Sequence, residues 1–205
     1  MTGKFITLEG IEGVGKSTHL QFVASWLRER GHSVVVTREP GGTPAAEQIR
    51  SVLLEESTDG IPPLAELLLM FAARAAHLET LIRPALSRGE WVVCDRFIDA
   101  TYAYQGAGRG LSSEIIEALA EIVQQGLRPD LTILLDVPLA VSLQRRAAWD
   151  QRDRFEREQD PFFARVQAAY RDIAAREPKR VRTVVTDRPI EEVQADIAGI
   201  MSNYV

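Results

Sequence analysis

The fold of this chain is decided by Gly10-Ile11-Glu12-Gly13-Val14-Gly15-Lys16-Ser17, which has the spacing GxxxxGK[ST]. An apolar run precedes this stretch at residues 5–8, and a segment with helical character follows from Thr18. Glycines at a strand-to-helix junction let successive backbone N–H groups point at phosphate oxygens, and the start of the helix adds positive potential. An accidental turn would rarely combine this spacing with both flanking elements, so we predict a phosphate-binding loop at residues 10–18.

Three residues of this loop carry chemistry of their own. We expect Lys16 to reach the β- and γ-phosphates of a nucleotide and the Ser17 hydroxyl to coordinate Mg²⁺. Glu12 is unexpected, because a bound triphosphate would repel its carboxylate. Glu12 is therefore either a solvated loop residue, or it faces away from the triphosphate and accepts a hydrogen bond from a sugar hydroxyl of a second substrate.

Length and charge limit the possible function classes. The 205 residues are enough for one larger α/β domain, so we expect a single domain over residues 1–205. The formal net charge of −5 argues against a protein that coats nucleic acid. Only Lys4, Lys16 and Lys179 are lysines among the 24 basic residues. The rest are arginines, whose planar guanidinium groups suit bidentate phosphate contacts.

Cysteine and histidine show no metal-site pattern. Cys94 is the only cysteine, which excludes an intrachain disulfide, and its apolar neighbours predict an inert thiol in a buried strand. His19, His32 and His77 lack ligand spacing, so we expect no protein-held structural metal. The sequence shows no signal-peptide pattern, and no apolar run approaches the ~20 residues that span a bilayer. We therefore expect a cytoplasmic protein without a membrane segment.

Strand and helix patterns alternate along the chain. Apolar, β-branched runs predict strands at residues 5–8, 33–37, 91–94, 131–137 and 181–185. Helices are predicted at about 17–30, 45–54, 63–87, 112–125, 138–146 and 189–202. A further long helix is predicted after residue 157 and ends at about residue 176. Short links between strand, helix and strand favour parallel pairing through right-handed crossovers. The sequence thus predicts an α/β fold.

Two further motifs contain side chains that could bind a ligand. Arg38 begins the run Arg38-Glu39-Pro40-Gly41-Gly42 after the second strand, at the edge where parallel sheets bind ligands. The run could equally be a turn with a surface charge. Phe71 and Arg74 lie three residues apart, hence on one helix face. Phe71 is either a core residue, or its ring stacks on a base while Arg74 bonds the base edge.

The third predicted strand ends in Asp95 and Arg96. After a phosphate loop, an aspartate at this place is typical of a carboxylate that holds Mg²⁺ through water. Arg96 would offset the repulsion between two phosphoryl groups. Residues 101–110 then mix aromatic, amide and small side chains. We predict a loop there, which either contacts a ligand or is an irregular surface loop.

Arginines are concentrated at about residues 145–157, where the chain contains Arg145, Arg146, Arg152, Arg154 and Arg157. Such a run is most often a solvated, charged connection. The functional interpretation is a mobile lid whose arginines neutralise charge over a triphosphate while the phosphoryl group moves.

Taken together, these segments resemble the thymidylate kinases over essentially the whole chain. The resemblance is carried by residues 10–18, 38–43, 95–97, 104–109 and 153–156. It implies a P-loop nucleoside monophosphate kinase fold with a five-stranded parallel sheet flanked by helices and a short arginine-rich lid. It also implies ATP as donor, dTMP as acceptor, Mg²⁺ as cofactor and a homodimer.

The same resemblance implies roles for single residues. Gly10 to Thr18 would bind ATP, with Ser17 and Asp95 at Mg²⁺. The acceptor would bind at about residues 38–75 and 95–110. In that region Arg38 would hold the phosphate of dTMP, and Phe71 and Arg74 would hold the thymine. The remaining dTMP contacts are Thr101 beside the base, Tyr104 near the sugar 2′ position, and Glu12, Arg96 and Gln105.

Members of this family differ in whether a catalytic arginine comes from the phosphate loop or from the lid. Residues 11–14 of the loop offer no cation, so the chain resembles the bacterial lid-arginine type. Beside Lys16 and Arg96, the catalytic candidates are Arg146, Arg152 and Arg154, and Arg145 or Arg146 is expected along the adenine.

Other functions remain open from the residues alone. A deoxynucleoside kinase of the same fold needs a base to deprotonate a hydroxyl, and no residue stands out for that role. A GTPase would need an asparagine-containing motif that reads guanine, yet Asn203 is the only asparagine. A non-catalytic nucleotide-binding subunit would not need Lys16, Asp95 and the arginines.

Overall fold

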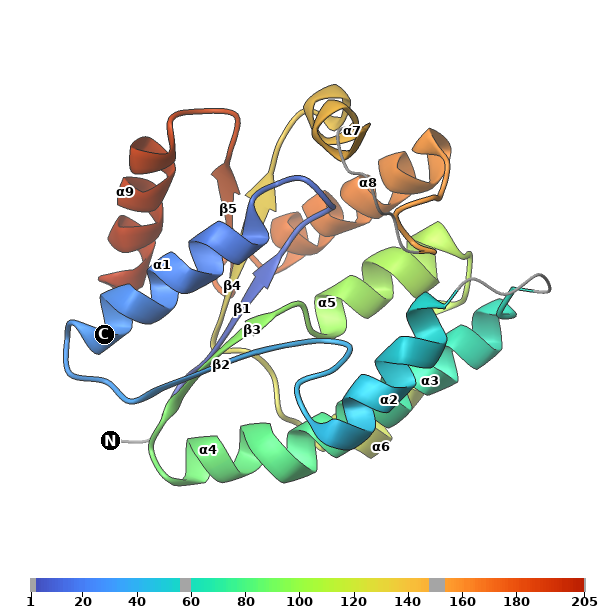
Figure 1. Ribbon diagram of the computed structural model, residues 1–205, viewed down its shortest axis with the longest axis horizontal. Helices are drawn as coiled ribbons and strands as arrows, with labels where there is room; N and C mark the ends of the chain where they lie inside the picture. Colours follow the sequence, from blue (N-terminus) through green and yellow to red (C-terminus); the bar gives the residue numbers. More distant parts are fainter. Residues whose placement is uncertain (1–2, 56–59, 148–153, 205) are drawn as a thin grey trace.

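A five-stranded parallel sheet forms the centre of the protein, in a computed structural model that describes residues 3–55, 60–147 and 154–204 (Figure 1). The strands are β1 (Phe5–Glu9), β2 (Val34–Arg38), β3 (Trp91–Asp95), β4 (Leu131–Asp136) and β5 (Val181–Val185). Their order is β2-β3-β1-β4-β5, and each pair of neighbours is parallel. The predicted five-stranded parallel sheet is confirmed, and the carboxyl ends of its strands share one edge.

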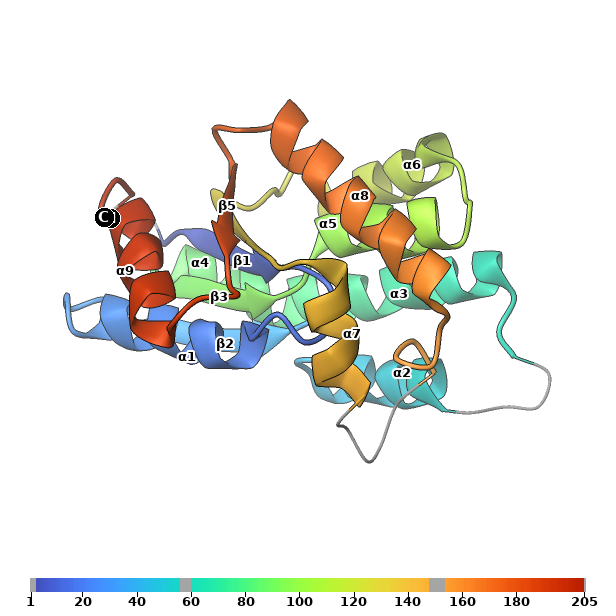
Figure 2. The ribbon, with the colours of Figure 1, turned by 90° about the horizontal axis from the view of Figure 1, so that it is seen from above.

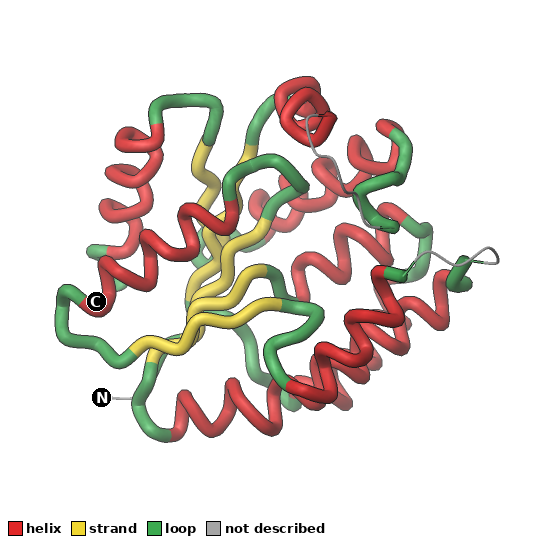
Figure 3. The backbone as a smooth tube through the Cα atoms, in the orientation of Figure 1, coloured by secondary structure: helices red, strands yellow, loops and turns green. Residues whose placement is uncertain are grey.

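Helices surround the sheet, as the tube in Figure 3 shows. The α-helices are α1 (Lys16–Arg28), α2 (Pro44–Leu54), α3 (Pro63–His77), α4 (Arg83–Ser87), α5 (Ile98–Thr101), α6 (Ser113–Gln124), α7 (Leu139–Ala147), α8 (Asp160–Arg176) and α9 (Ile190–Met201). In Figures 1 and 2, α1 and α9 lie at one end of the molecule and α2, α3 and α6 at the other. None of the described helices is both long and apolar enough to cross a bilayer.

Two segments differ from the sequence prediction. The helix expected at 63–87 has the right extent, but a π-helical segment, Leu78–Ile82, separates α3 from α4. The loop predicted at 101–110 is wrong, because α5 continues into a second π-helical segment, Tyr102–Gly108. The small residues serve close packing instead of a loop: a Cβ on Gly108 would lie 2.6 Å from the ring of Phe162 on α8.

Side chains of β1 alternate between two apolar clusters. Ile6 and Leu8 belong to the cluster that includes residues of α1, α8 and α9. Phe5 belongs to the other cluster, which includes Phe71 of α3 and the buried Cys94. This packing on both faces fixes β1 and β3, and with them the loops that leave their carboxyl ends.

Candidate active site

The phosphate loop joins β1 to α1. Gly10, Gly13 and Gly15 have φ angles of +136°, +76° and +89°, a backbone conformation that other residues rarely adopt. A Cβ on Gly10 would lie 2.3 Å from the carbonyl oxygen of Leu135, so only glycine fits there. Because α1 begins at Lys16, its first N–H groups have no acceptor inside the helix. These groups and the helix dipole make the loop a suitable anion site.

Lys16 is held against the inside of this loop. Its Nζ donates to the carbonyl oxygens of Gly10 and Ile11 at 3.1 and 2.9 Å. Burial, and then the charge of Arg96, lower the pKa of Lys16 to about 8, although nearby carboxylates act in the opposite direction. Phosphate anions beside the ammonium would raise this pKa again, so anion binding and the charge on Lys16 support each other.

Arg96 links the end of β3 to three other side chains. Its Nη2 donates to Oε1 of Glu12 at 2.9 Å and to the Tyr104 hydroxyl at 3.0 Å. Its Nη1 donates to the Tyr170 hydroxyl at 2.9 Å. The guanidinium carbon also lies 4.7 Å from the centroid of the Tyr104 ring. These contacts hold the cation in one orientation beside the phosphate loop.

Glu12 turns toward Arg96 and away from bulk water. The Tyr104 hydroxyl lies 2.7 and 2.8 Å from the two carboxylate oxygens, and the side chain is only 11% exposed. Burial alone would raise the pKa of Glu12, but the charges of Arg96 and Lys16 and the Tyr104 hydrogen bond outweigh it and lower the pKa. The structure therefore excludes the solvated interpretation, while the contact with a sugar hydroxyl stays a prediction.

A cavity lies beside Arg96, between the phosphate loop, α2, α3 and the segment after β3. Among the described residues it is lined by Glu12, Glu39, Pro40, Arg50, Leu54, Met70, Arg96, Ala100, Tyr104, Gln105 and Phe155. Four of the predicted dTMP-binding residues meet here, namely Glu12, Arg96, Tyr104 and Gln105. An apolar wall with a few charged groups is typical of a small-molecule site.

Arg74 is buried directly behind Glu39 of this wall. Its Nε donates to Oε2 of Glu39 at 2.8 Å, and its Nη2 donates to the Thr101 hydroxyl at 2.9 Å. Within the described part of the chain, Nη1 of Arg74 and Oε1 of Gln105 are buried without a hydrogen-bond partner. These two atoms are a donor and an acceptor that a ligand could pair.

The thymidylate kinase family model matches residues 8–197 of this chain. The chain belongs to the thymidylate kinase family. The thymidylate kinase of Methylococcus capsulatus is 56% identical over 196 residues, which cover 96% of this chain and 93% of the relative. That of Teredinibacter turnerae is 53% identical over 205 residues and covers both chains completely.

A solved structure agrees with this membership. The crystal structure of thymidylate kinase from Ehrlichia chaffeensis matches with a TM-score of 0.81 at 32% identity, covering 98% of this chain and 100% of that chain. The predicted P-loop kinase fold is therefore confirmed, and the chain is an ATP-dependent kinase of nucleotide biosynthesis.

Four residues that the family resemblance assigned to dTMP do not line the cavity. Arg74 and its partner Thr101 lie behind Glu39, and Phe71 and Arg38 lie elsewhere. Phe71 is 2% exposed and packs in the core, whereas its neighbour Met70 belongs to the cavity wall. Arg38 is half exposed and forms an ion pair with Glu47 at 2.9 Å. Arg50, one turn after Glu47 in α2, lines the cavity together with Arg96. Thymine stacking by Phe71 and phosphate binding by Arg38 stay predictions.

Three of the described lid arginines have different environments. Arg145 donates to the carbonyl oxygen of Gly13 in the phosphate loop at 2.9 Å. Arg146 is buried, with its guanidinium carbon 3.6 Å from the ring centroid of Phe163. Arg154 forms an ion pair with the buried Glu66 of α3 at 2.7 Å. Arg152 lies outside the described residues, so its catalytic role stays a prediction.

Magnesium fits the carboxylate at the end of β3. Oδ1 of Asp95 is buried and, among the residues described, has no hydrogen-bond partner. Such an oxygen suits a metal-bound water, and Mg²⁺ usually binds through few protein oxygens together with substrate phosphates. Ser17 is exposed in the first turn of α1, and the coordination of Mg²⁺ by its hydroxyl stays a prediction. No group of three or more metal-ligating side chains occurs in the described residues.

Three buried residues of this site were not predicted from the sequence. Glu9 accepts from the backbone N–H of Phe97 at 2.7 Å, and Tyr170 contacts Arg96 from α8. Glu66 of α3 forms an ion pair with Arg154 and accepts a hydrogen bond from Gln105. Glu9 had a local signal, since it directly precedes Gly10. Tyr170 and Glu66 have helical spacing typical of any core residue, so only their distant partners identify them.

Proposed function

We propose that this chain transfers the γ-phosphoryl group of ATP to dTMP, giving dTDP and ADP, as a step in dTTP synthesis. Family membership supports the reaction class. The cavity beside the phosphate loop supports the choice of a pyrimidine nucleotide as acceptor.

The proposal is carried by two buried polar atoms that have no partner among the described residues: Oε1 of Gln105, whose side chain lines the cavity, and Nη1 of Arg74, whose guanidinium lies behind Glu39 of the cavity wall. Arg74 Nη1 can only donate. Gln105 donates its Nε2 to the carboxylate of Glu66 at 2.9 Å, so its Oε1 faces away from that acceptor and can itself accept. A thymine edge offers a matching carbonyl acceptor and an N–H donor. Cytosine offers the reverse pair, which would leave two buried groups unsatisfied.

Phosphoryl transfer then needs charge compensation more than proton transfer. The attacking oxygen of dTMP is already anionic, so no general base is required; the task is to bring two anions together in line. Two unit charges ~4 Å apart interact by roughly 4 kcal/mol at an effective dielectric of about 20. Lys16 and Arg96 offset this repulsion from two sides. Mg²⁺, held through Ser17 and Asp95, would neutralise charge on the triphosphate oxygens.

The deoxyribose of dTMP would contact Tyr104 and Glu12. The Tyr104 ring is 6% exposed and lines the cavity, and its hydroxyl is fixed by Glu12 and Arg96. Because the ring is held firmly, little space remains for a hydroxyl group on the 2′ carbon of the sugar. This supports a preference for deoxyribose over ribose. The ionised Glu12 supplies an acceptor for a sugar hydroxyl.

An acceptor comparison tests this function. Purified protein with ATP and Mg²⁺ is offered dTMP, dUMP, dCMP and thymidine, and ADP and nucleotide products are separated chromatographically. We expect kcat/KM for dCMP to be at least about 100-fold below that for dTMP, because buried polar groups would stay unpaired. Equal use of dCMP would contradict the base assignment, and turnover of thymidine alone would indicate a deoxynucleoside kinase.

We also propose a homodimer through α3 and α6. These helices pack against each other, and Leu64 and Leu68 of α3 and Ile115 and Ile122 of α6 are 43–70% exposed. Such a set of large apolar side chains on adjacent helices suits a self-complementary interface. A location in the cytoplasm and a single domain over residues 1–205 stay predictions.

A further inference from the structure

A chain of hydrogen bonds runs from Arg96 into the core. The Arg96 Nη1 donates to the Tyr170 hydroxyl at 2.9 Å, and this hydroxyl donates to Oε2 of Glu9 at 2.7 Å. The other oxygen of Glu9 accepts from the backbone N–H of Phe97 at 2.7 Å. One carboxyl group therefore contacts both the side-chain partner of Arg96 and the backbone that follows Arg96.

The backbone at Arg96 needs such support. Its φ of +69° lies in the left-handed region, which costs energy for a residue with a side chain and persists only where neighbours enforce it. The N–H of Arg96 donates to the carbonyl oxygen of Leu8, and the N–H of Phe97 donates to the Glu9 carboxyl group. Glu9 thus fixes the turn that directs the Arg96 side chain toward the phosphate loop.

Packing does not explain why two polar side chains, Glu9 and Tyr170, are buried in this part of the core. Glu9 is 0% exposed and Tyr170 is 3% exposed, although an apolar pair would avoid burying a carboxyl and a hydroxyl. Tyr170 sits on α8, 161 positions along the chain from Glu9. Its ring packs edge-to-face on Tyr104, with centroids 6.3 Å apart, so phenylalanine would preserve the packing. Packing alone therefore does not require the Tyr170 hydroxyl.

We propose that Glu9 and Tyr170 are positioning residues for phosphoryl transfer: they hold the Arg96 guanidinium where the two reacting phosphates meet. The inference rests on the proposed role of Arg96. Glu12 and Tyr104 hold one side of the guanidinium, and Tyr170 holds the other. Without Tyr170 the group keeps its charge but gains freedom to rotate, and misplacement of a catalytic group reduces turnover.

Tyr170→Phe tests the proposal, because it removes one oxygen atom and keeps the ring. We expect kcat with dTMP to fall by about 10- to 30-fold, with the KM for ATP within about twofold of the wild type. The matched control is Tyr204→Phe, which removes a hydroxyl bonded to the carbonyl of Lys179 and should leave kcat unchanged. Melting temperatures of both variants verify that each is folded.

A double-mutant cycle separates positioning from a general structural effect. In an Arg96→Ala background, Tyr170→Phe should change kcat by less than about twofold, because its only route to the reaction has been removed. An equal loss in both backgrounds would overturn the proposal, and so would a wild-type kcat for Tyr170→Phe alone. Failure of the proposed function itself would be distinguishable, since the wild type would then form no dTDP.

Glu9→Gln provides an independent variant. Burial raises the pKa of Glu9 to about 8, so the amide resembles the neutral acid in shape. It replaces the oxygen that accepts from either the Phe97 N–H or the Tyr170 hydroxyl by an NH₂ group, which cannot accept. We expect kcat to fall, and adding Tyr170→Phe to Glu9→Gln should lower it by less than about twofold more, because the two residues act in one chain. Independent, multiplying losses would contradict a shared role.

Discussion

Lys16→Ala should reduce dTDP formation by at least about 1,000-fold, the largest effect that we expect from a single substitution, since Lys16 compensates charge on the transferred phosphoryl group. Lys16 is held by the carbonyl oxygens of Gly10 and Ile11 inside the phosphate loop. Removing the ammonium leaves the loop amides as the remaining donors from this segment to the β- and γ-phosphates. The rate is measured as dTDP formed from dTMP at saturating ATP and Mg²⁺.

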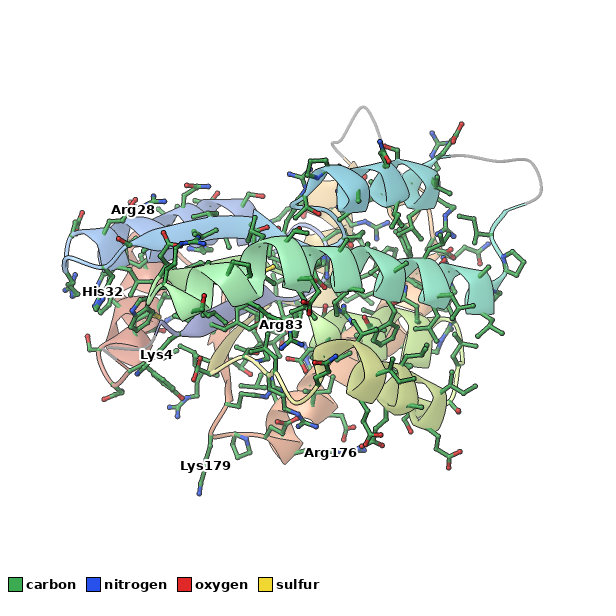
Figure 4. The ribbon with its side chains drawn as sticks, turned by 90° about the horizontal axis from the view of Figure 1, so that it is seen from below. Lys4, Arg28, His32, Arg83, Arg176 and Lys179 are labelled. Carbon is green, nitrogen blue, oxygen red and sulfur yellow. The ribbon has the colours of Figure 1, made fainter. Side chains whose placement is uncertain are left out.

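Lys179→Ala is the matched control for this substitution. Lys4 and Lys179 lie before β1 and β5, at the amino ends of the strands and opposite the phosphate loop (Figure 4). Removing the charge of Lys179 should therefore leave turnover within about twofold of the wild type, as for other surface substitutions away from a site. If Lys16→Ala retained more than a tenth of wild-type turnover, the loop would not be the site of transfer.

Arg96→Ala should lower kcat by about 100- to 1,000-fold while the KM for ATP changes by less than about threefold. The guanidinium contacts Glu12 and Tyr104 on the cavity wall, so we expect it to face the reacting phosphates and not the adenosine. An interaction that strengthens only as the two phosphates approach affects kcat more than ground-state binding. Steady-state kinetics with both substrates varied gives the two constants.

The control for Arg96 is Arg176→Ala at the exposed end of α8. Arg176 pairs with Asp172 on the helix surface, where a single ion pair contributes little, so we expect wild-type kinetics and a nearly unchanged melting temperature. A normal kcat for Arg96→Ala together with weakened ATP binding would refute its assignment to phosphoryl transfer.

The parts of the site that sequence reasoning could predict are those that depend on neighbours along the chain. The phosphate loop needs glycines at Gly10, Gly13 and Gly15, and their positive φ angles are a local requirement. Asp95 and Arg96 were placed correctly because strand β3 ends there and parallel strands end at one edge. Local spacing thus sufficed to predict the loop after β1 and the residues at the end of β3.

The acceptor side depends on contacts between distant residues. Arg154 lies in the arginine-rich segment that predicted a lid. Its ion-pair partner, however, is Glu66, which lies 88 positions earlier in the chain. Spacing of three placed Phe71 and Arg74 on one face of α3, but Met70 is equally close to that face, four residues from Arg74. The structure places Met70 in the cavity wall and Phe71 in the core. Periodicity cannot distinguish two adjacent apolar residues of this kind.

Residues 101–110 show why composition misled the prediction there. Glycines and a mixture of aromatic and amide residues usually indicate a loop. Here Gly106 and Gly108 sit in a π-helical segment that packs closely on α6 and α8. π-Helical segments are rare and often occur at functional sites, and this one positions Tyr104 and Gln105 at the cavity.

The central claim is tested most directly by incubating the purified protein with equal amounts of ATP and dTMP in the presence of Mg²⁺ and quantifying all four nucleotides over time. The account predicts that dTDP and ADP appear together in a one-to-one ratio, and that ADP forms at least about 100-fold more slowly when dTMP is replaced by dCMP at the same concentration. Formation of ADP without dTDP, or no conversion of dTMP at any concentration of protein, would contradict it.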